Sequence, residues 1–146
     1  MIGIQGSKTS AIVKMLQKTP LWSSLSENEL KVIAKESEEL KFDSGHVIVE
    51  KGATGVGFFL VVEGMVEVQS EGRVLSKLGP GQFFGEMSLL DDRPRSADVV
   101  AVEPCRCLGL AAWSFKGIVS SHPKIALKVM QELIRRLRVT NQALSE

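Results

Sequence analysis

The chain has 146 residues and a mass of 15.9 kDa, close to the usual size of one domain. Apolar residues make up 44% of it and charged residues 24%, and the net charge is +1. With a net charge so close to zero, the chain has no overall positive electrostatic potential that would attract nucleic acid or an acidic membrane. This counts against DNA binding by this chain alone. No apolar run reaches the ~18 residues that a membrane span requires, and the N-terminus lacks the pattern of a secretory signal. We therefore expect a single cytoplasmic domain over residues 1–146.

Two cysteines and two histidines are the candidates for a disulfide or a metal site. Cys105 and Cys107 would point to the same face of a strand, but such neighbouring strand positions rarely satisfy disulfide geometry. His46 and His122 are far apart in the chain, so no set of four zinc ligands is evident. We expect two reduced thiols, no metal and no enzymatic chemistry.

The N-terminal region predicts two helices within residues 9–38. Residues 1–8 are small and polar and are expected to be disordered. Apolar residues at helical spacing predict a helix over residues 9–18. Ser26 followed by Glu29 is a capping-box pattern, and it predicts a second helix that ends near Glu38.

Short apolar runs broken by glycine occupy residues 40–110. Residues 58–69 read as two strands joined at Glu63-Gly64, and residues 74–78 as another strand after the turn at Glu71-Gly72. About eight short strands at regular spacing indicate an antiparallel sandwich or roll.

Helical periodicity returns over residues 112–144. A short helix is predicted from Trp113 to Ser120 and a longer one after Pro123. The fold class is therefore α+β: an antiparallel eight-stranded, jelly-roll-like β-roll between N-terminal helices and a long C-terminal helix. An apolar stripe on the long helix would form a lid, a dimer seam or part of the monomer core; it consists of Met130, Leu133, Ile134, Leu137 and Leu144.

One segment interrupts the strand pattern in the middle of the β region. Gly85 permits a backbone that a Cβ would obstruct. Residues 86–90 can form one helical turn whose free N–H groups attract an anion. Arg95 can offer a planar fork of donors to two phosphate oxygens, and the small residues Ser96 and Ala97 let backbone N–H groups approach the same anion.

A carboxylate and an arginine lie nine residues apart in this segment. Arg95 would take an anionic group, and Glu86 would accept a hydrogen bond from a hydroxyl of the same ligand. Alternatively, Glu86 and Arg95 pair with each other on a surface loop, which would stabilise the fold little. The residue types alone leave both interpretations open.

The string FGEMSLL…RPRSADV resembles the phosphate-binding cassette of the cyclic-nucleotide-binding domain superfamily. This superfamily includes the catabolite activator protein, the regulatory subunits of cAMP-dependent kinase and the cyclic-nucleotide-gated channels. The similarity extends over residues 21–140 and includes FFLVVEG at 58–64 and LGPGQFFGE at 78–86. It implies that Glu86 binds the ribose 2′-hydroxyl and Arg95 the cyclic phosphate. The other implied ligand contacts are Gly85, Met87, Ser96 and Ala97, with Leu75 enclosing the sugar and base.

Residues 135–140 resemble the end of the long helix in the catabolite activator protein, where two consecutive residues contact adenine. Thr140 and Asn141 occupy those positions here. The alternative is a solvated basic helix end near the terminus. Ser96 occupies a position from which a Ser or Thr in this family can also hydrogen-bond guanine, which leaves cGMP as the alternative. Because the catabolite activator protein also has Ser there and prefers cAMP, the resemblance implies cAMP rather than cGMP.

The resemblance implies a sensor that switches conformation when it binds the nucleotide and that acts on an unknown effector protein or fused domain. It would form a homodimer if the C-terminal helix is a dimer seam. A second possibility is the sensor portion of a transcription regulator, whose DNA binding would need a segment beyond the long helix. A third is a degenerate module that binds proteins and no nucleotide.

Overall fold

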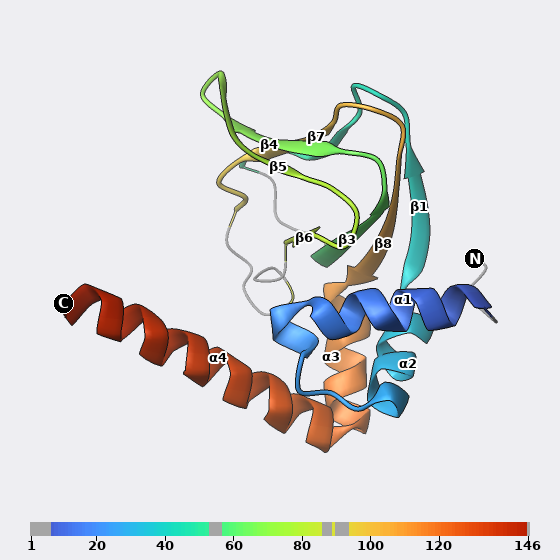
Figure 1. The fold of residues 1–146 in the computed structure, drawn as a ribbon, viewed down its shortest axis with the longest axis vertical. Helices are drawn as coiled ribbons and strands as arrows, with labels where there is room; N and C mark the ends of the chain where they lie inside the picture. Colours follow the sequence, from blue (N-terminus) through green and yellow to red (C-terminus); the bar gives the residue numbers. More distant parts are fainter. Residues whose placement is uncertain (1–6, 53–56, 86–88, 90–93, 146) are drawn as a thin grey trace.

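Helices stand at both ends of the chain and eight described strands lie between them (Figure 1). The computed structural model describes residues 7–52, 57–85, 89 and 94–145. The elements in chain order are α1 (Ser7–Lys18), the 3-10 helix η1 (Pro20–Trp22), α2 (Glu27–Lys35), β1 (Glu38–Phe42), β2 (Val47–Val49), β3 (Gly57–Glu63), β4 (Val66–Ser70), β5 (Arg73–Leu78), β6 (Phe83–Phe84), β7 (Asp98–Ala101), β8 (Cys105–Ala111), α3 (Ala112–Ser121) and α4 (Pro123–Ser145). The α+β class and the predicted strands and helices are confirmed.

The strands form two antiparallel four-stranded sheets with the orders β1-β8-β3-β6 and β2-β7-β4-β5. Neighbouring strands are mostly not consecutive in the chain, which is the connectivity of a jelly-roll-like roll. Alternation along β3 separates two cores. Phe58 and Leu60 pack against the helices, whereas Phe59 and Val61 pack inside the roll.

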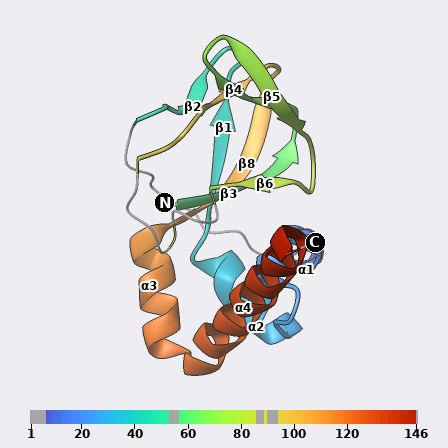
Figure 2. The ribbon, with the colours of Figure 1, turned by 90° about the vertical axis from the view of Figure 1, so that its left-hand side faces the viewer.

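The helices gather at one end of the roll (Figures 1 and 2). Trp22 is fully buried between them and the sheet, with its ring centroid 5.7 Å from those of both Phe58 and Phe115. This aromatic cluster joins η1, β3 and α3, so it fixes the helices on the outer face of the first sheet.

The N-terminal boundaries differ slightly from those expected. The first helix begins at Ser7, inside the segment that was expected to be disordered, and the capping box of Ser26 and Glu29 is present in full. The second helix ends at Lys35 rather than near Glu38, because the backbone N–H of the next residue closes onto carbonyls of the last turn. Glu38 instead begins β1.

Glu29 links this cap to the long helix. Its Oε1 atom accepts hydrogen bonds from the Ser26 backbone N–H at 2.8 Å and from Lys128 Nζ at 2.6 Å. The Lys128 ammonium, followed by the Ser26 N–H, holds the pKa of the Glu29 carboxyl below its usual value of 4.5. A carboxyl with a lowered folded pKa stabilises the fold above its ordinary pKa and loses that contribution as the pH falls through the folded value.

The substitution Glu29→Gln should therefore lower the free energy of unfolding at neutral pH by about 0.5–1 kcal/mol. The difference from the unsubstituted protein should shrink as the pH falls below 4.5, because both proteins then lack the charge. Urea unfolding at several pH values measures this. Glu27→Gln, which removes only an exposed contact of 3.8 Å to Lys31, is the control. A difference that stays constant down to pH 3 would contradict the assignment.

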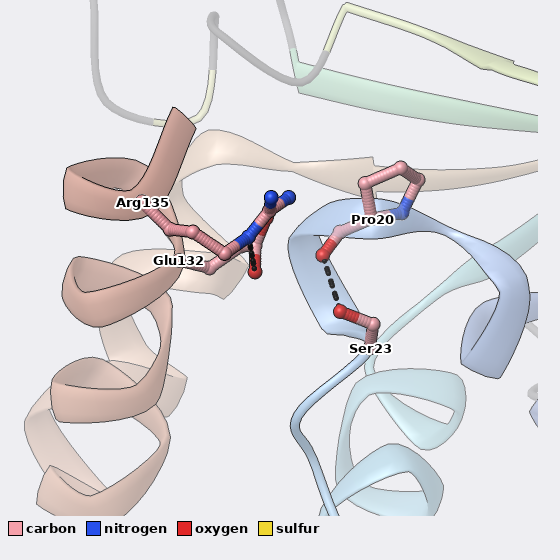
Figure 3. Close-up of polar contacts among 4 residues, drawn as sticks. All are labelled: Pro20, Ser23, Glu132 and Arg135. Atoms are coloured by element: carbon pink, nitrogen blue, oxygen red, sulfur yellow. Dashed lines mark hydrogen bonds and ion pairs between the residues drawn. The ribbon is translucent and has the colours of Figure 1, made fainter. Parts of the chain in front are cut away.

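The first half of α4 is held against the rest of the domain. Ile125 and Val129 are buried in the helical core. Glu132, 7% exposed, pairs with Arg135 at 2.6 Å, and both side chains lie beside η1, where Ser23 Oγ donates to the Pro20 carbonyl (Figure 3). Beyond this point the helix extends away from the roll (Figure 1). No helix in the described part of the chain is long and apolar enough to span a membrane.

Candidate anion-binding site

Two hydrogen bonds attach Arg95 and the residues just after it to the turn at residues 51–52. Its carbonyl accepts a hydrogen bond from the Gly52 N–H at 2.8 Å. Three residues later, Asp98 Oδ1 accepts one from the Lys51 N–H at 2.6 Å. The turn at residues 51–52 therefore holds the chain at the arginine and on its C-terminal side, and this fixes where its side chain starts.

The Arg95 guanidinium is partly buried, and the residues that the structure describes compensate little of its charge. Its Nη2 donates to the Gly57 carbonyl oxygen at 2.9 Å, while the buried Nε has no hydrogen-bond partner. Within the described ranges, Arg95 forms no ion pair with a carboxylate. Burial lowers the pKa of Arg95, because the charged form has lost water. An anion placed here would replace the lost hydration and satisfy the free donor.

Gly85 lies directly against this guanidinium. The pairing of Phe84 with Phe59 carries the end of β6 to the start of β3. Gly85 has a φ of +80°, and a Cβ there would collide with the Gly57 carbonyl oxygen and lie 2.8 Å from Arg95 Nη1. The structure thus brings together two of the sequence-derived site residues, Gly85 and Arg95, and only glycine fits the space between them.

The remaining sequence-derived site residues are distributed more widely. Ser96 is exposed and Ala97 half-buried, next to the arginine in the chain. Glu86 and Met87 lie outside the described residues, so the alternative of an ion pair between Glu86 and Arg95 is not resolved by the geometry. Leu75 is on β5 with 59% of its side chain exposed.

Thr140 and Asn141 lie in the last turns of α4, on the half of the helix that extends away from the roll (Figure 1). Each of them has at least one interaction partner. The structure does not bring them to Arg95, so contact between these residues and a bound base would require that half of α4 to move.

Gly57 is the residue that sequence reasoning missed. Its carbonyl is the acceptor for Arg95, although the two residues are 38 positions apart. Its φ is +144°, and a Cβ would collide with the Leu110 carbonyl oxygen. The glycine-rich run before Phe58 was a visible signal of unusual backbone, but nothing in it indicated which side chain it would meet.

The thiols offer no reactive nucleophile. Cys105 and Cys107 point to the same face of β8, as predicted, and both are buried and unpaired. Burial raises the pKa of Cys107 to about 12, so it is a neutral thiol at physiological pH. Among the described residues, no group of three or more His, Cys, Asp or Glu side chains is placed to hold a metal ion.

A family model described as the cyclic nucleotide-binding domain matches residues 39–122. The chain is 38% identical over 131 residues to glutaminase 2 of Bradyrhizobium diazoefficiens, which covers 86% of this chain and 21% of that protein. It is 33% identical over 128 residues to the cyclic AMP receptor protein of Thermus thermophilus, covering 84% of this chain and 59% of the relative.

Among solved structures, the N-terminal domain of a transcriptional regulator from Streptomyces coelicolor superposes with a TM-score of 0.83 at 27% identity, covering 89% of this chain and 94% of that one. Both curated relatives are much longer, and this chain spans about a fifth of one and three fifths of the other. The family model covers more than half of the chain, including both sheets and Arg95. The chain belongs to the cyclic nucleotide-binding domain family.

Proposed function

We propose that this chain is a sensor domain for cAMP, and that Arg95 binds the cyclic phosphate. The observation that carries the proposal is the buried guanidinium, which has an unused Nε donor and whose pKa is lowered by lost hydration. A phosphate diester has two non-bridging oxygens that share one negative charge, and these match the two-pronged geometry of an arginine. The domain itself performs no chemistry; it is regulatory and cytoplasmic.

The other contacts follow the family pattern. Gly85 leaves room for the phosphate beside Arg95, and the backbone N–H groups of Ser96 and Ala97 complete the anion site. Glu86 accepts a hydrogen bond from the ribose 2′-hydroxyl, and Met87 follows it in the cassette. The exposed Leu75 on β5 supplies an apolar wall for the sugar and base, which would bury part of its side chain.

We propose cAMP rather than cGMP because a similar relative is named for cyclic AMP. Ser96 could also hydrogen-bond guanine, so cGMP should bind as well, but more weakly. In the switch that we propose, the C-terminal half of α4 moves toward the nucleotide and brings Thr140 and Asn141 to the adenine. The nucleotide can drive this movement only if it binds the closed arrangement more tightly, typically by ~1–3 kcal/mol.

The test is calorimetric titration of the protein with cAMP, cGMP and linear AMP, together with melting temperatures at saturating ligand. Both cyclic nucleotides should bind and raise the melting temperature, with the larger rise for cAMP. Linear AMP, with a dianionic phosphate that is not held in a ring, should bind at least tenfold more weakly. If neither cyclic nucleotide binds, the sensor assignment fails and the interaction module without nucleotide is the correct interpretation.

We further propose that α4 pairs with α4 of a second copy. Four of its apolar side chains are each more than half exposed and spaced by three, four and three residues, the heptad spacing of a coiled-coil seam; they are Leu127, Met130, Ile134 and Leu137. Leu133, which the sequence placed in the same stripe, packs against the helical core instead. Asn141 continues the spacing by four, and a polar residue at such a position favours one register of a two-stranded pair.

The substitution Leu137→Glu should convert this dimer to a monomer, because it would place two carboxylates in an apolar seam. Light scattering behind size-exclusion chromatography measures the mass. Val139→Glu introduces the same charge at a residue 54% exposed but off the seam, and this variant should remain a dimer. If the unsubstituted protein is a monomer at high micromolar concentration, the stripe is not a dimer seam.

We propose that the activity controlled by nucleotide binding belongs to an effector, which is either a partner protein or a fused domain. The similar proteins suggest that such a domain can control different activities, since one is a glutaminase and another is the N-terminal domain of a transcriptional regulator. The near-complete coverage of the latter favours the sensor portion of a transcription regulator as the second candidate.

A further inference from the structure

A hollow of about 270 Å³ lies on the first sheet, and its lining includes Gly57, whose carbonyl holds Arg95. Strand register places Glu38 and Phe59 on either side of Gly109, and the next pair along is Gly57 with Ala111. Directly paired residues share a face, and this face is the one that carries Cys107 into the roll interior. Two of these positions are glycines, which have no side chain to cover the sheet. The sheet surface is therefore uncovered here, next to the part of the roll that core side chains fill.

Gly109 keeps the hollow open. A Cβ at this position would lie 3.0 Å from Leu40 Cδ1 and 3.6 Å from Phe59 Cε2, which form two of the walls. Phe58, Leu110 and Ala111 complete the apolar lining. The interior of the hollow is therefore apolar and can take an aliphatic chain.

Two side chains of a different kind stand at its edge. Trp113, in the first turn of α3, is 72% exposed, and Glu38 is exposed on the facing strand. Neither the indole ring nor the carboxylate has an interaction partner among the residues that the structure describes. An exposed tryptophan and a free carboxylate beside an apolar hollow are the groups that recognise a guanidinium on an aliphatic stem.

We propose that this hollow receives an arginine side chain of a polypeptide partner. Its volume is below the ~300 Å³ at which pockets for drug-sized ligands begin, so it suits one side chain rather than a cofactor. The arginine methylenes would lie between Leu40 and Phe59, and its guanidinium would stack on Trp113 and pair with Glu38. Gly57, at the start of β3, forms a wall of the hollow and also accepts the hydrogen bond of Arg95. The docked arginine would therefore contact the same end of β3 that Arg95 binds. The proposal does not depend on nucleotide binding.

The experiment uses the two indole N–H signals of the ¹⁵N-labelled protein. Trp113 is at the hollow, whereas Trp22 is fully buried behind Phe58, which lines the hollow, so its signal reports any general change of the helical core. The probe is the peptide acetyl-Gly-Arg-Gly-amide, which should shift the Trp113 signal saturably and leave the Trp22 signal in place. The same peptide with citrulline, which keeps the shape but loses the charge, should bind roughly fivefold more weakly or worse. Ethylguanidinium, with its shorter stem, should also bind at least threefold more weakly than the arginine peptide.

Glu38→Gln should weaken binding of the arginine peptide roughly threefold. Glu36→Gln makes the same charge change two residues away, at an exposed position outside the hollow, and should leave the affinity unchanged. The proposal is overturned if the arginine peptide fails to shift the Trp113 signal, or if the citrulline peptide or a leucine peptide binds as tightly. Equal affinity for ethylguanidinium would assign the hollow to a free organic cation and would also overturn it.

Discussion

Arg95→Ala should abolish most of the affinity for cAMP while leaving the domain folded. Removing the partner of a buried charged group costs roughly 2–5 kcal/mol, which is a thirtyfold or greater loss of affinity. The fold should tolerate the change, because the guanidinium is held by a neutral acceptor, the Gly57 carbonyl, and its burial already disfavours its charge. Calorimetric titration gives the affinity, and thermal melting without ligand gives the stability.

The control for this experiment is Arg73→Ala, which removes the same side chain from an exposed position on β5. Its affinity for cAMP should equal that of the unsubstituted protein, so that a loss at Arg95 reflects the site rather than the net charge. If Arg95→Ala binds cAMP with the same isotherm as the unsubstituted protein, another residue holds the phosphate and the assignment to Arg95 is wrong.

Trp22→Ala should destabilise the fold far more than the substitutions at Glu29 and Arg95. The indole is fully buried and packs on both Phe58 and Phe115, so its removal leaves a cavity where η1, β3 and α3 meet. Deleting a buried aromatic side chain of this size costs about 3–5 kcal/mol. Urea unfolding followed by far-UV circular dichroism measures the change.

Trp113→Ala is the matched control, because Trp113 is 72% exposed and its loss should change the free energy of unfolding by about 0.5 kcal/mol or less. Equal effects of the two substitutions would mean that the aromatic cluster does not anchor the helices on the sheet. Because α4 is attached through the same helical core, Trp22→Ala should also weaken any response of α4 to a bound nucleotide.

Local patterns allowed the correct prediction of much of the fold. Ser26 and Glu29 form the capping box that their spacing indicates, because both partners lie within one helical turn. The strand pair at Glu63-Gly64 and the turn at Glu71-Gly72 also follow the sequence, since glycine placement and alternation act over a few residues. The end of α2 at Lys35 does not follow the sequence prediction. From Glu38 onward the chain pairs with β8 as strand β1, and this distant partner removes the last predicted residues from the helix.

The sequence by itself determined the α+β class and the helix cap, and it suggested the type of site, because these depend on residue types and spacings along the chain. Only the tertiary structure decided that the Arg95 guanidinium meets the Gly57 carbonyl and the bare backbone of Gly85. It likewise decided that Leu133 packs inward while Ile134 and Leu137 face outward, which one apolar stripe could not distinguish. In each case the physical reason is the same: burial and hydrogen bonding depend on which distant segments fold against a residue, and a local pattern does not specify them.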